Sequence, residues 1–255
     1  MNASKINEIL NSYAPLELSN RFVEMTGGYD NSGIILNTGA KIKGVVFSLD
    51  LTNKAVEYAI EKDCNLIITH HPAIFKGGCF SDKNSPIFTA IEKGINVISY
   101  HLNLDVAKRG IDYYLANGLG ASEQVIVYDL QGGQGYGRKY KSQGEKFLQI
   151  VKLYEQTFNS KRIITYGNLN EKVNKIASFC GSGLSENEIS LASDCDLLIS
   201  SDAPHHVILK AGSVGKKLML VTHYSAEFYG FSKFYEHFSN KLSVKTFLLK
   251  EDAYL

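Results

Sequence analysis

The chain has 255 residues, of which 44% are hydrophobic and 21% charged, and its formal net charge is +1. A chain of this length and composition can bury one large or two small cores, which excludes an intrinsically disordered protein. The balance of acidic and basic residues provides no overall field that would recruit nucleic acid or a membrane surface. Partners must therefore be inferred from local sites.

The N-terminus and the cysteines indicate the compartment. No basic segment followed by an apolar core opens the chain, and no apolar run reaches the roughly 20 residues that span a bilayer. We therefore expect a cytoplasmic protein without a membrane partner. The cysteines occur singly, which favours buried reduced thiols over a zinc knuckle or a disulfide framework. They are Cys64, Cys79, Cys180 and Cys195.

Strand-like and helix-like segments alternate between residues 43 and 105. This alternation predicts a largely parallel sheet with crossover helices. A helix is expected over 106–117, because Ile111, Tyr114 and Leu115 recur at helical spacing. The alternating segments are strand-like 44–51, helix-like 53–63, strand-like 65–72, helix-like 85–94 and strand-like 96–105.

A glycine-rich, basic segment, 131–147, predicts a boundary or a hairpin between two lobes. Beyond it the alternation restarts, so the fold class is α/β, with two similar α/β lobes that have mixed, partly parallel sheets. We place the lobes at 1–128 and 129–255, with the C-terminal strand able to return to the first. The later segments are helix-like 147–158, 185–194, 205–212 and 227–242, and strand-like 162–168, 172–181, 196–202, 217–224 and 244–250.

Six of the seven histidines follow shortly after an aliphatic strand-like run. In α/β sheets, ligands bind at the carboxyl ends of the strands, where loops converge. His70 and His71 are adjacent, and their rings point to opposite sides unless the strand ends between them, which Pro72 favours. Two such rings can reach two different metal ions. Taken alone, the pair is better explained by two polar residues at a loop entrance.

Two further strand ends carry a histidine followed four residues later by a carboxylate. They are His101 with Asp105, and His223 with Glu227, which share one helix face if a helix is capped there by Ser225. His70, His71, Asp105, His223 and Glu227 together form a nitrogen and oxygen set that suits zinc, iron, manganese or cobalt. We expect a site for two divalent ions in the cleft between the lobes, bridged by a glutamate.

Two other groups of residues leave alternatives open. Asp202 and His206, after the next strand end, suit either the orientation of metal ligands or proton transfer to substrate, but a helix start capped by Asp202 explains them equally well. The roles of His205 and His206 stay open. Arg138, Lys139 and Lys141 can hold a triphosphate as mobile cations, or form a solvated hairpin, which we favour.

The chain resembles the Nif-three-like proteins, the dinuclear metal centre hexameric family catalogued as GTP cyclohydrolase 1 type 2 homologues. The resemblance runs from Asn65 to Glu227, and YDNSGIIL near residue 30 resembles the family's early W-D-N-x-G-L segment. Tyr29 replaces the usual tryptophan, Ser200 to Asp202 replace threonine-glycine-acid, and the closing asparagine-proline is absent. The motifs that carry the resemblance are LIITHHPAIF, HLNLD, FCGSG, DAPHH and THYSAE.

The resemblance implies that the five residues collected above are the metal ligands. It implies that Glu227 bridges the ions, with His71 and Asp105 on one and His70 and His223 on the other. It further implies the compact form of the family and a ring-shaped homohexamer whose sites face an inner cavity.

The activity that the resemblance implies is a metal-dependent hydrolase acting on a nucleotide. A metal-bound hydroxide would open the imidazole ring of GTP at C8 and release formate, with Glu227 in the catalytic centre and His101 or His206 moving protons. The sequence has no G-x-x-x-x-G-K-[ST] phosphate loop. The alternative is a non-enzymatic metal-binding scaffold, carrier or regulatory partner. Nucleic-acid binding inside the ring is disfavoured by the net charge.

Overall fold

The computed structural model describes residues 1–75 and 82–251. The chain forms two compact units: unit 1 is Met1–Ala107 with Phe231–Lys250, and unit 2 is Lys108–Gly230 with Glu251. The sequence-based boundary at residues 128 and 129 falls inside unit 2. It lies at the end of β5 (Val125–Asp129), which pairs with β6 (Gly135–Lys141) in one sheet.

Unit 1 contains a five-stranded sheet in the order β1-β4-β3-β2-β11. The last four strands of this order run parallel, and β1 is antiparallel to β4. The strands are β1 (Gly33–Leu36), β2 (Gly44–Ser48), β3 (Leu66–Thr69), β4 (Asn96–Ser99) and β11 (Lys245–Leu248). The helices are α1 (Ala3–Asn11), α2 (Leu16–Thr26), α3 (Asn53–Glu61), α4 (Pro86–Glu92) and α5 (Leu102–Asp105).

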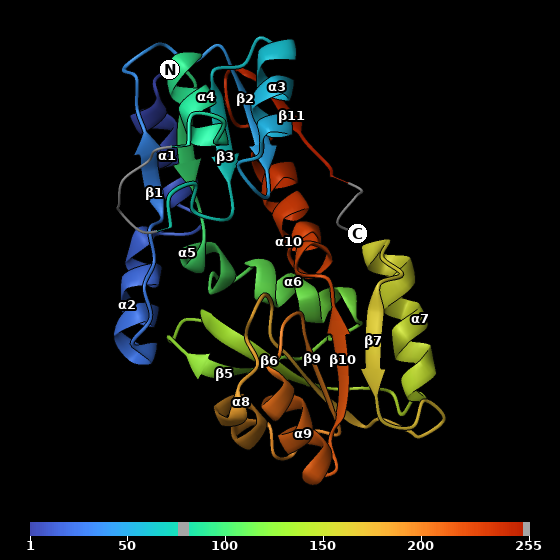
Figure 1. The fold of residues 1–255 in the computed structure, drawn as a ribbon. Helices are drawn as coiled ribbons and strands as arrows, with labels where there is room; N and C mark the ends of the chain where they lie inside the picture. The colour runs from blue at the N-terminus through green and yellow to red at the C-terminus, as the bar shows by residue number, and fades with distance from the viewer. Residues whose placement is uncertain (76–81, 252–255) are drawn as a thin grey trace. The chain divides into compact units, whose positions relative to one another are not determined.

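The central strands of unit 1 are buried on both faces, which explains their unbroken aliphatic character. Val46 and Ile67 belong to a core with Ala55 of α3 and Ala90 of α4, so these two helices cover one face (Figure 1). Phe47, the neighbour of Val46, points to the opposite face. There it contacts the aromatic C-terminal half of α10 (His223–Phe238).

Unit 2 contains a six-stranded mixed sheet in the order β5-β6-β8-β9-β10-β7. Figure 1 shows α6 (Ile111–Gly118) on one side of this sheet and α8 (Glu186–Leu191) and α9 (His205–Ser213) on the other. The predicted α/β class, with two lobes that have mixed, partly parallel sheets, is confirmed. The remaining elements are α7 (Phe147–Phe158), β7 (Ile163–Tyr166), β8 (Lys175–Ser178), β9 (Leu197–Ser200) and β10 (Lys217–Val221).

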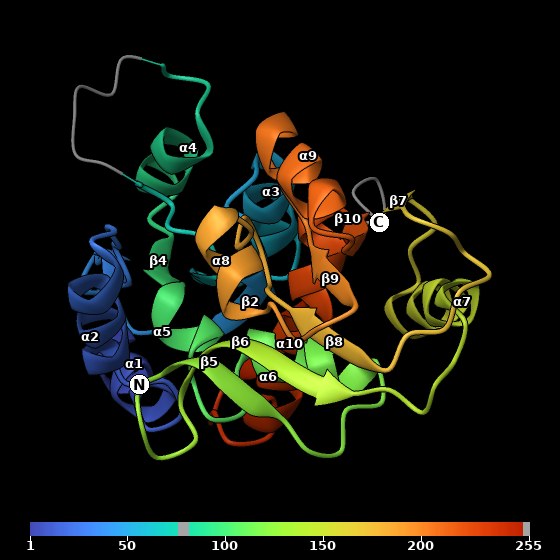
Figure 2. The ribbon, with the colours of Figure 1, turned by 90° about the horizontal axis from the view of Figure 1, so that it is seen from below.

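The structure differs from three local predictions made from the sequence. The helix expected from residue 106 begins at Ile111, because Gly110 has an extended backbone. Helix α10 begins at His223 rather than Glu227, because the Thr222 hydroxyl caps it by accepting the Ser225 N–H at 3.1 Å. Residues 131–141 of the glycine-rich segment belong to a hairpin, formed by β5 and β6, which lies at the edge of the unit 2 sheet rather than between the lobes (Figure 2).

The thiols of Cys64, Cys180 and Cys195 are buried and free, as predicted, while Cys79 lies outside the described residues. Burial raises the pKa of Cys195 to about 11, so this thiol stays protonated at neutral pH. Among the described residues, none of the helices combines the length and the apolar character needed to cross a bilayer.

Candidate metal centre

The paired histidines lie just beyond the end of β3. The strand ends at Thr69, and the backbone N–H groups of His70 and His71 both donate to the Leu49 carbonyl at 3.0 Å. The Thr69 hydroxyl donates to the His71 carbonyl at 2.7 Å. These bonds turn the chain out of the sheet ladder, so both rings leave the strand at its carboxyl end.

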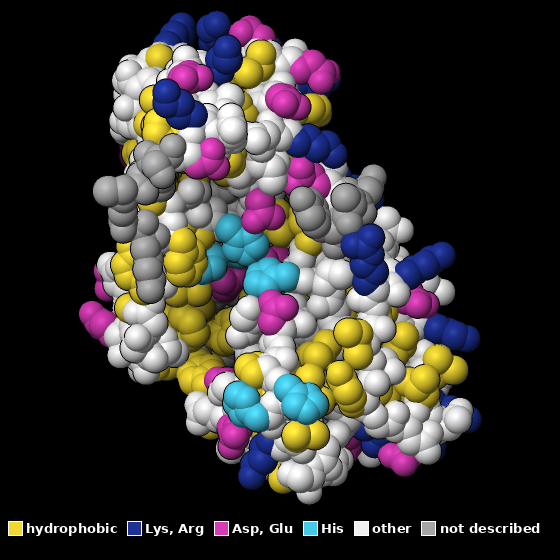
Figure 3. Space-filling view, viewed as in Figure 1, with side chains coloured by type: hydrophobic (Ala, Val, Ile, Leu, Met, Phe, Trp, Pro, Cys, Tyr) yellow, Lys and Arg dark blue, Asp and Glu magenta, His cyan; other side chains and the backbone are white. Residues whose placement is uncertain are grey.

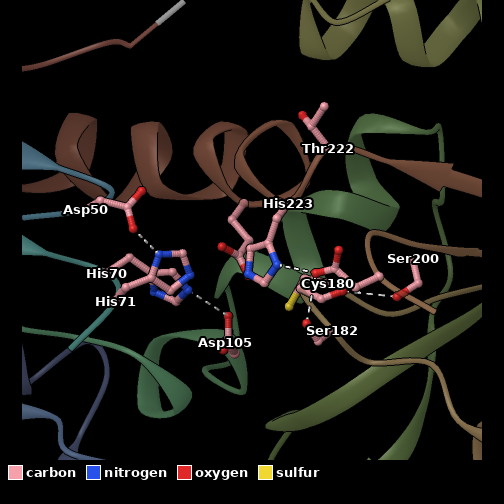
Figure 4. Close-up of polar contacts among 12 residues, drawn as sticks. Asp50, His70, His71, Asp105, Cys180, Ser182, Ser200, Thr222 and His223 are labelled. Atoms are coloured by element: carbon pink, nitrogen blue, oxygen red, sulfur yellow. Dashed lines mark hydrogen bonds and ion pairs between the residues drawn. The ribbon is translucent and has the colours of Figure 1, made fainter. Parts of the chain in front are cut away.

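His70 is buried, and each of its ring nitrogens has a defined neighbour. Nδ1 lies 2.8 Å from the Tyr100 carbonyl oxygen, which can only accept, so Nδ1 carries the proton and Nε2 the lone pair. Nε2 lies 3.5 Å from Oδ1 of Asp105 (Figure 4). Two ligand atoms on one tetrahedral zinc ion lie roughly 3.4 Å apart, given bonds of about 2.1 Å. The separation therefore suits an ion shared by His70 and Asp105, whereas the resemblance implies that Asp105 shares an ion with His71.

His71 and His101 are oriented in the same way, each by a carboxylate. His71 Nδ1 lies 2.7 Å from Asp50, and His101 Nδ1 lies 2.8 Å from Asp30. Ligand atoms of His70, His71 and His101 lie within 4.8 Å of one another, so this group can hold a metal ion. Sequence reasoning assigned no role to Asp50 or Asp30. The available signal for Asp50 was its position after the carboxyl end of β2, and for Asp30 its place in the YDNSGIIL segment.

Asp30 is a strongly ionised carboxylate. Burial raises its pKa, but hydrogen bonds from His101, Ser19 and Ser32 outweigh burial and lower the pKa to about 2. The Ser32 hydroxyl donates at 2.6 Å, and Ser19 donates to the same oxygen. A permanent negative charge at Asp30 keeps the proton of His101 on Nδ1 and directs the Nε2 lone pair toward the histidine group.

Unit 2 positions a second histidine with a carboxylate, in the first turn of α10. His223 Nε2 lies 3.0 Å from Oε1 of Glu227, which is only 2% exposed. His223 Nδ1 lies 2.7 Å from Asp202, which also accepts the Ser182 hydroxyl at 2.9 Å. Asp202 therefore orients His223. The alternative that Asp202 caps a helix is wrong, because Pro204 is the N-cap of α9.

Gly181 allows the backbone to approach this pair. Its φ of +60° is a conformation that other residues rarely adopt, and an added Cβ would lie 2.7 Å from Oε1 of Glu227. The Gly181 carbonyl accepts the Ser200 hydroxyl at 3.1 Å and the Ser201 N–H at 3.2 Å. These bonds connect the loop after β8 to the end of β9, and Figure 4 shows Ser182 on that loop and Ser200 at the end of the strand.

Replacing Gly181 with alanine should weaken metal binding by about 10- to 100-fold, since the new methyl group displaces Glu227. Gly215→Ala is the matched control, because Gly215 has a φ of +72° but open space around its would-be Cβ. Both variants should lose about 1–3 kcal/mol of stability in urea denaturation. Competitive titration with a chelator measures the affinities, and equal affinities in the two variants would contradict the role of Gly181.

The other candidate residues fall outside these two groups. Figure 3 shows histidine side chains at the surface; His205 and His206 are exposed on the first turn of α9, without a hydrogen bond or ion pair to any described residue. Arg138 is 1% exposed and lies 3.7 Å from Asp112, so its role as a mobile phosphate-binding cation is wrong, as is its solvated alternative. Lys139 pairs with Asp194 at 3.2 Å.

The fold and these side chains define a class: a protein of two α/β units that carries groups of histidines and carboxylates able to hold a metal ion. The chain belongs to the Duf34/NIF3 (NGG1p interacting factor 3) family, whose match covers residues 1–253. The family suggested by the sequence motifs is thereby confirmed.

Curated relatives match most of the chain. A "GTP cyclohydrolase 1 type 2 homolog" of Methanocaldococcus jannaschii is 28% identical, over 96% of this chain and 98% of its own length. The similarly named protein of Clostridium perfringens is also 28% identical, over 88% and 87%. "NGG1-interacting factor 3" of Saccharomyces cerevisiae is 28% identical over 78% and 79%.

Solved structures match at the level of the fold. "Reduced HcgD" from Methanocaldococcus jannaschii superposes with a TM-score of 0.81, at 26% identity and over 98% of both chains. The Staphylococcus aureus hypothetical protein SA1388 superposes with a TM-score of 0.85, at 22% identity, over 98% of this chain and 97% of its own.

Proposed function

We propose that the protein is a metal-dependent hydrolase that opens the imidazole ring of GTP or a related nucleotide and releases formate. In this proposal His70, His71, Asp105, His223 and Glu227 hold two divalent ions. The substrate class follows from the relatives named GTP cyclohydrolase 1 type 2 homologues. The observation that carries the metal assignment is the orientation of the histidines.

Each of the three histidine ligands has its Nδ1 beside an oxygen atom. The partners are the Tyr100 carbonyl for His70, Asp50 for His71 and Asp202 for His223. Metal-binding histidines nearly always have such a partner, which fixes the tautomer, orients the ring and makes the free nitrogen more basic. The arrangement thus supports Nε2 ligation in both units. Nitrogen and oxygen donors are compatible with zinc, iron, manganese or cobalt.

In the proposed reaction, the ions and individual side chains would have separate roles. When bound, two divalent ions would supply an acidified water and polarise the bond under attack. Glu227, which is buried, would balance part of their charge, while Asp202 orients His223. His101, whose Nδ1 is held by Asp30, would move a proton to or from the substrate through Nε2. His206 stays a second candidate for proton transfer.

Metal analysis followed by a nucleotide assay tests the proposal. The purified protein is stripped with a chelator and reloaded separately with zinc, iron, manganese or cobalt. Each form is then incubated with GTP and a panel of nucleotides while formate and ring-opened products are measured. We expect formate from a reloaded form and none from the stripped form. Full metal occupancy with no product from any nucleotide would favour the non-enzymatic scaffold.

We also propose that the chain assembles as a homohexamer in the cytoplasm, which the resemblance to the family supports. Light scattering of the purified protein should then give about six times the chain mass of 28.3 kDa. A mass of one or two chains at the concentration of the assay would contradict this assembly.

A further inference from the structure

A polar pocket of about 250 Å³ lies in unit 1, between α2 and the loop that precedes β1. Leu16, Ser19, Asn20 and Val23 line it from α2, where their spacing of three and four residues places them on one helix face. The loop contributes residues 30–32. The volume is below the roughly 300–1,000 Å³ of pockets that take whole drug-sized ligands, so this pocket fits part of a nucleotide.

The charge of the lining selects against phosphate. Asp30 is ionised, and neither lysine nor arginine is among the lining residues. A phosphate would therefore be repelled by the negatively charged lining, which has no cation to compensate. The amides of Asn20 and Asn31 offer both donors and acceptors, while Leu16 and Val23 offer apolar contact. This lining suits an uncharged ring with polar edges.

Two exposed aromatic rings lie beside the pocket loop: Tyr29 precedes it in the chain, and Phe75 lies close to Tyr29 in space. Tyr29 is 49% exposed and Phe75 is 51% exposed, and their ring centroids are 6.2 Å apart in an edge-to-face arrangement. Asn31 holds this arrangement through a hydrogen bond to the carbonyl of Ile74 at 2.6 Å. Exposed aromatic faces bind planar heterocycles by stacking, with little dependence on the identity of the base.

The pocket is connected directly to a candidate proton carrier. Asp30 lines the pocket and accepts from His101, and Ser32 of the same lining accepts the His101 backbone N–H at 3.0 Å. The Phe75 ring lies 6.0 Å from the His101 ring. A ligand in this pocket is therefore held by the residues that position His101.

We infer that this pocket binds the planar, uncharged base of the substrate, rather than its phosphates. The inference rests on the proposed function only for the choice of a nucleotide, because the pocket belongs to unit 1 and its lining contains none of the proposed metal ligands. It assigns to Asn20, Asn31 and the aromatic pair the recognition of a heterocycle whose polar edge enters the pocket.

Binding to the metal-stripped, full-length protein tests the inference apart from any turnover. Guanosine, adenosine and inorganic pyrophosphate are titrated by calorimetry or NMR. We expect a purine nucleoside to bind and pyrophosphate not to compete with it. Asn20→Phe, which fills the pocket from an exposed position, should weaken nucleoside binding at least about tenfold. Ile60→Phe, at a 47% exposed position on α3, is the control and should leave binding unchanged.

Three outcomes would overturn the inference: no nucleoside binds, Asn20→Phe binds as tightly as the wild type, or pyrophosphate displaces the nucleoside. Formate release by the metal-loaded protein is scored separately. A protein that binds nucleoside through this pocket but releases no formate would contradict the hydrolase and leave the pocket assignment standing. If the protein hydrolyses GTP but Asn20→Phe has no effect on nucleoside binding, the result would support the hydrolase and contradict the pocket assignment.

Discussion

Glu227→Gln should lower nucleotide turnover by at least roughly a hundredfold while the protein remains folded. Removing a hydrogen-bond partner of a metal ligand typically lowers metal affinity or activity about 10- to 100-fold. Neutralising a ligand itself should therefore lower the activity at least as much. Glu227 is 2% exposed and its Oε1 lies 3.0 Å from His223 Nε2. Glutamine retains the shape of the side chain but offers a neutral amide, which neither balances two cations nor bridges them well.

The matched control is Glu236→Gln on the same helix. Glu236 is exposed and pairs with Lys233 at 2.9 Å, so its neutralisation should change turnover little. Formate release and bound metal are measured for both variants, with circular dichroism as the check on folding. If Glu227→Gln turns over nucleotide as fast as the wild type, Glu227 is not a residue of the catalytic centre. Equal losses in the two variants would indicate a general effect of charge on α10.

The sequence located the buried strands well because burial on both faces requires unbroken aliphatic runs. Leu66–Thr69 and Leu197–Ser200 are such runs, and each is followed by polar residues at the expected edge of the sheet. The start of α10 was misplaced, since Thr222 and Ser225 are both acceptable N-cap residues and only the backbone decides between them. Element identity was therefore easier to predict than element boundaries.

The partners of the histidines could not be read from local sequence. Asp50 lies 21 positions from His71, and Asp30 lies 71 positions from His101, so no motif spacing relates them. The role of Gly181 could not be predicted from local sequence either. Its positive φ and its close approach to Glu227 are evident only in the folded unit. The ligand types could be predicted from chemistry, whereas the residues that orient them depended on the fold.

The double variant His70→Ala/His71→Ala should lose the proposed pair of ions from the protein. It removes one nitrogen ligand from each ion in the proposed arrangement, and the buried His70 ring also faces Asp105 at 3.5 Å. A ligand that binds only the native state stabilises it by about 4 kcal/mol at a thousand times its dissociation constant. The wild type should therefore melt at a lower temperature after chelation, and the variant should not respond to the chelator.

The chain contains its own control, a second pair of adjacent histidines. His205→Ala/His206→Ala alters two exposed side chains on α9 and should retain both ions and the response to the chelator. Because loss of the buried His70 ring can itself destabilise unit 1, the single variant His71→Ala, whose side chain is 25% exposed, is measured beside it. Two ions per chain in His70→Ala/His71→Ala would exclude both residues as ligands. Loss of metal from the α9 variant alone would move the centre to that helix.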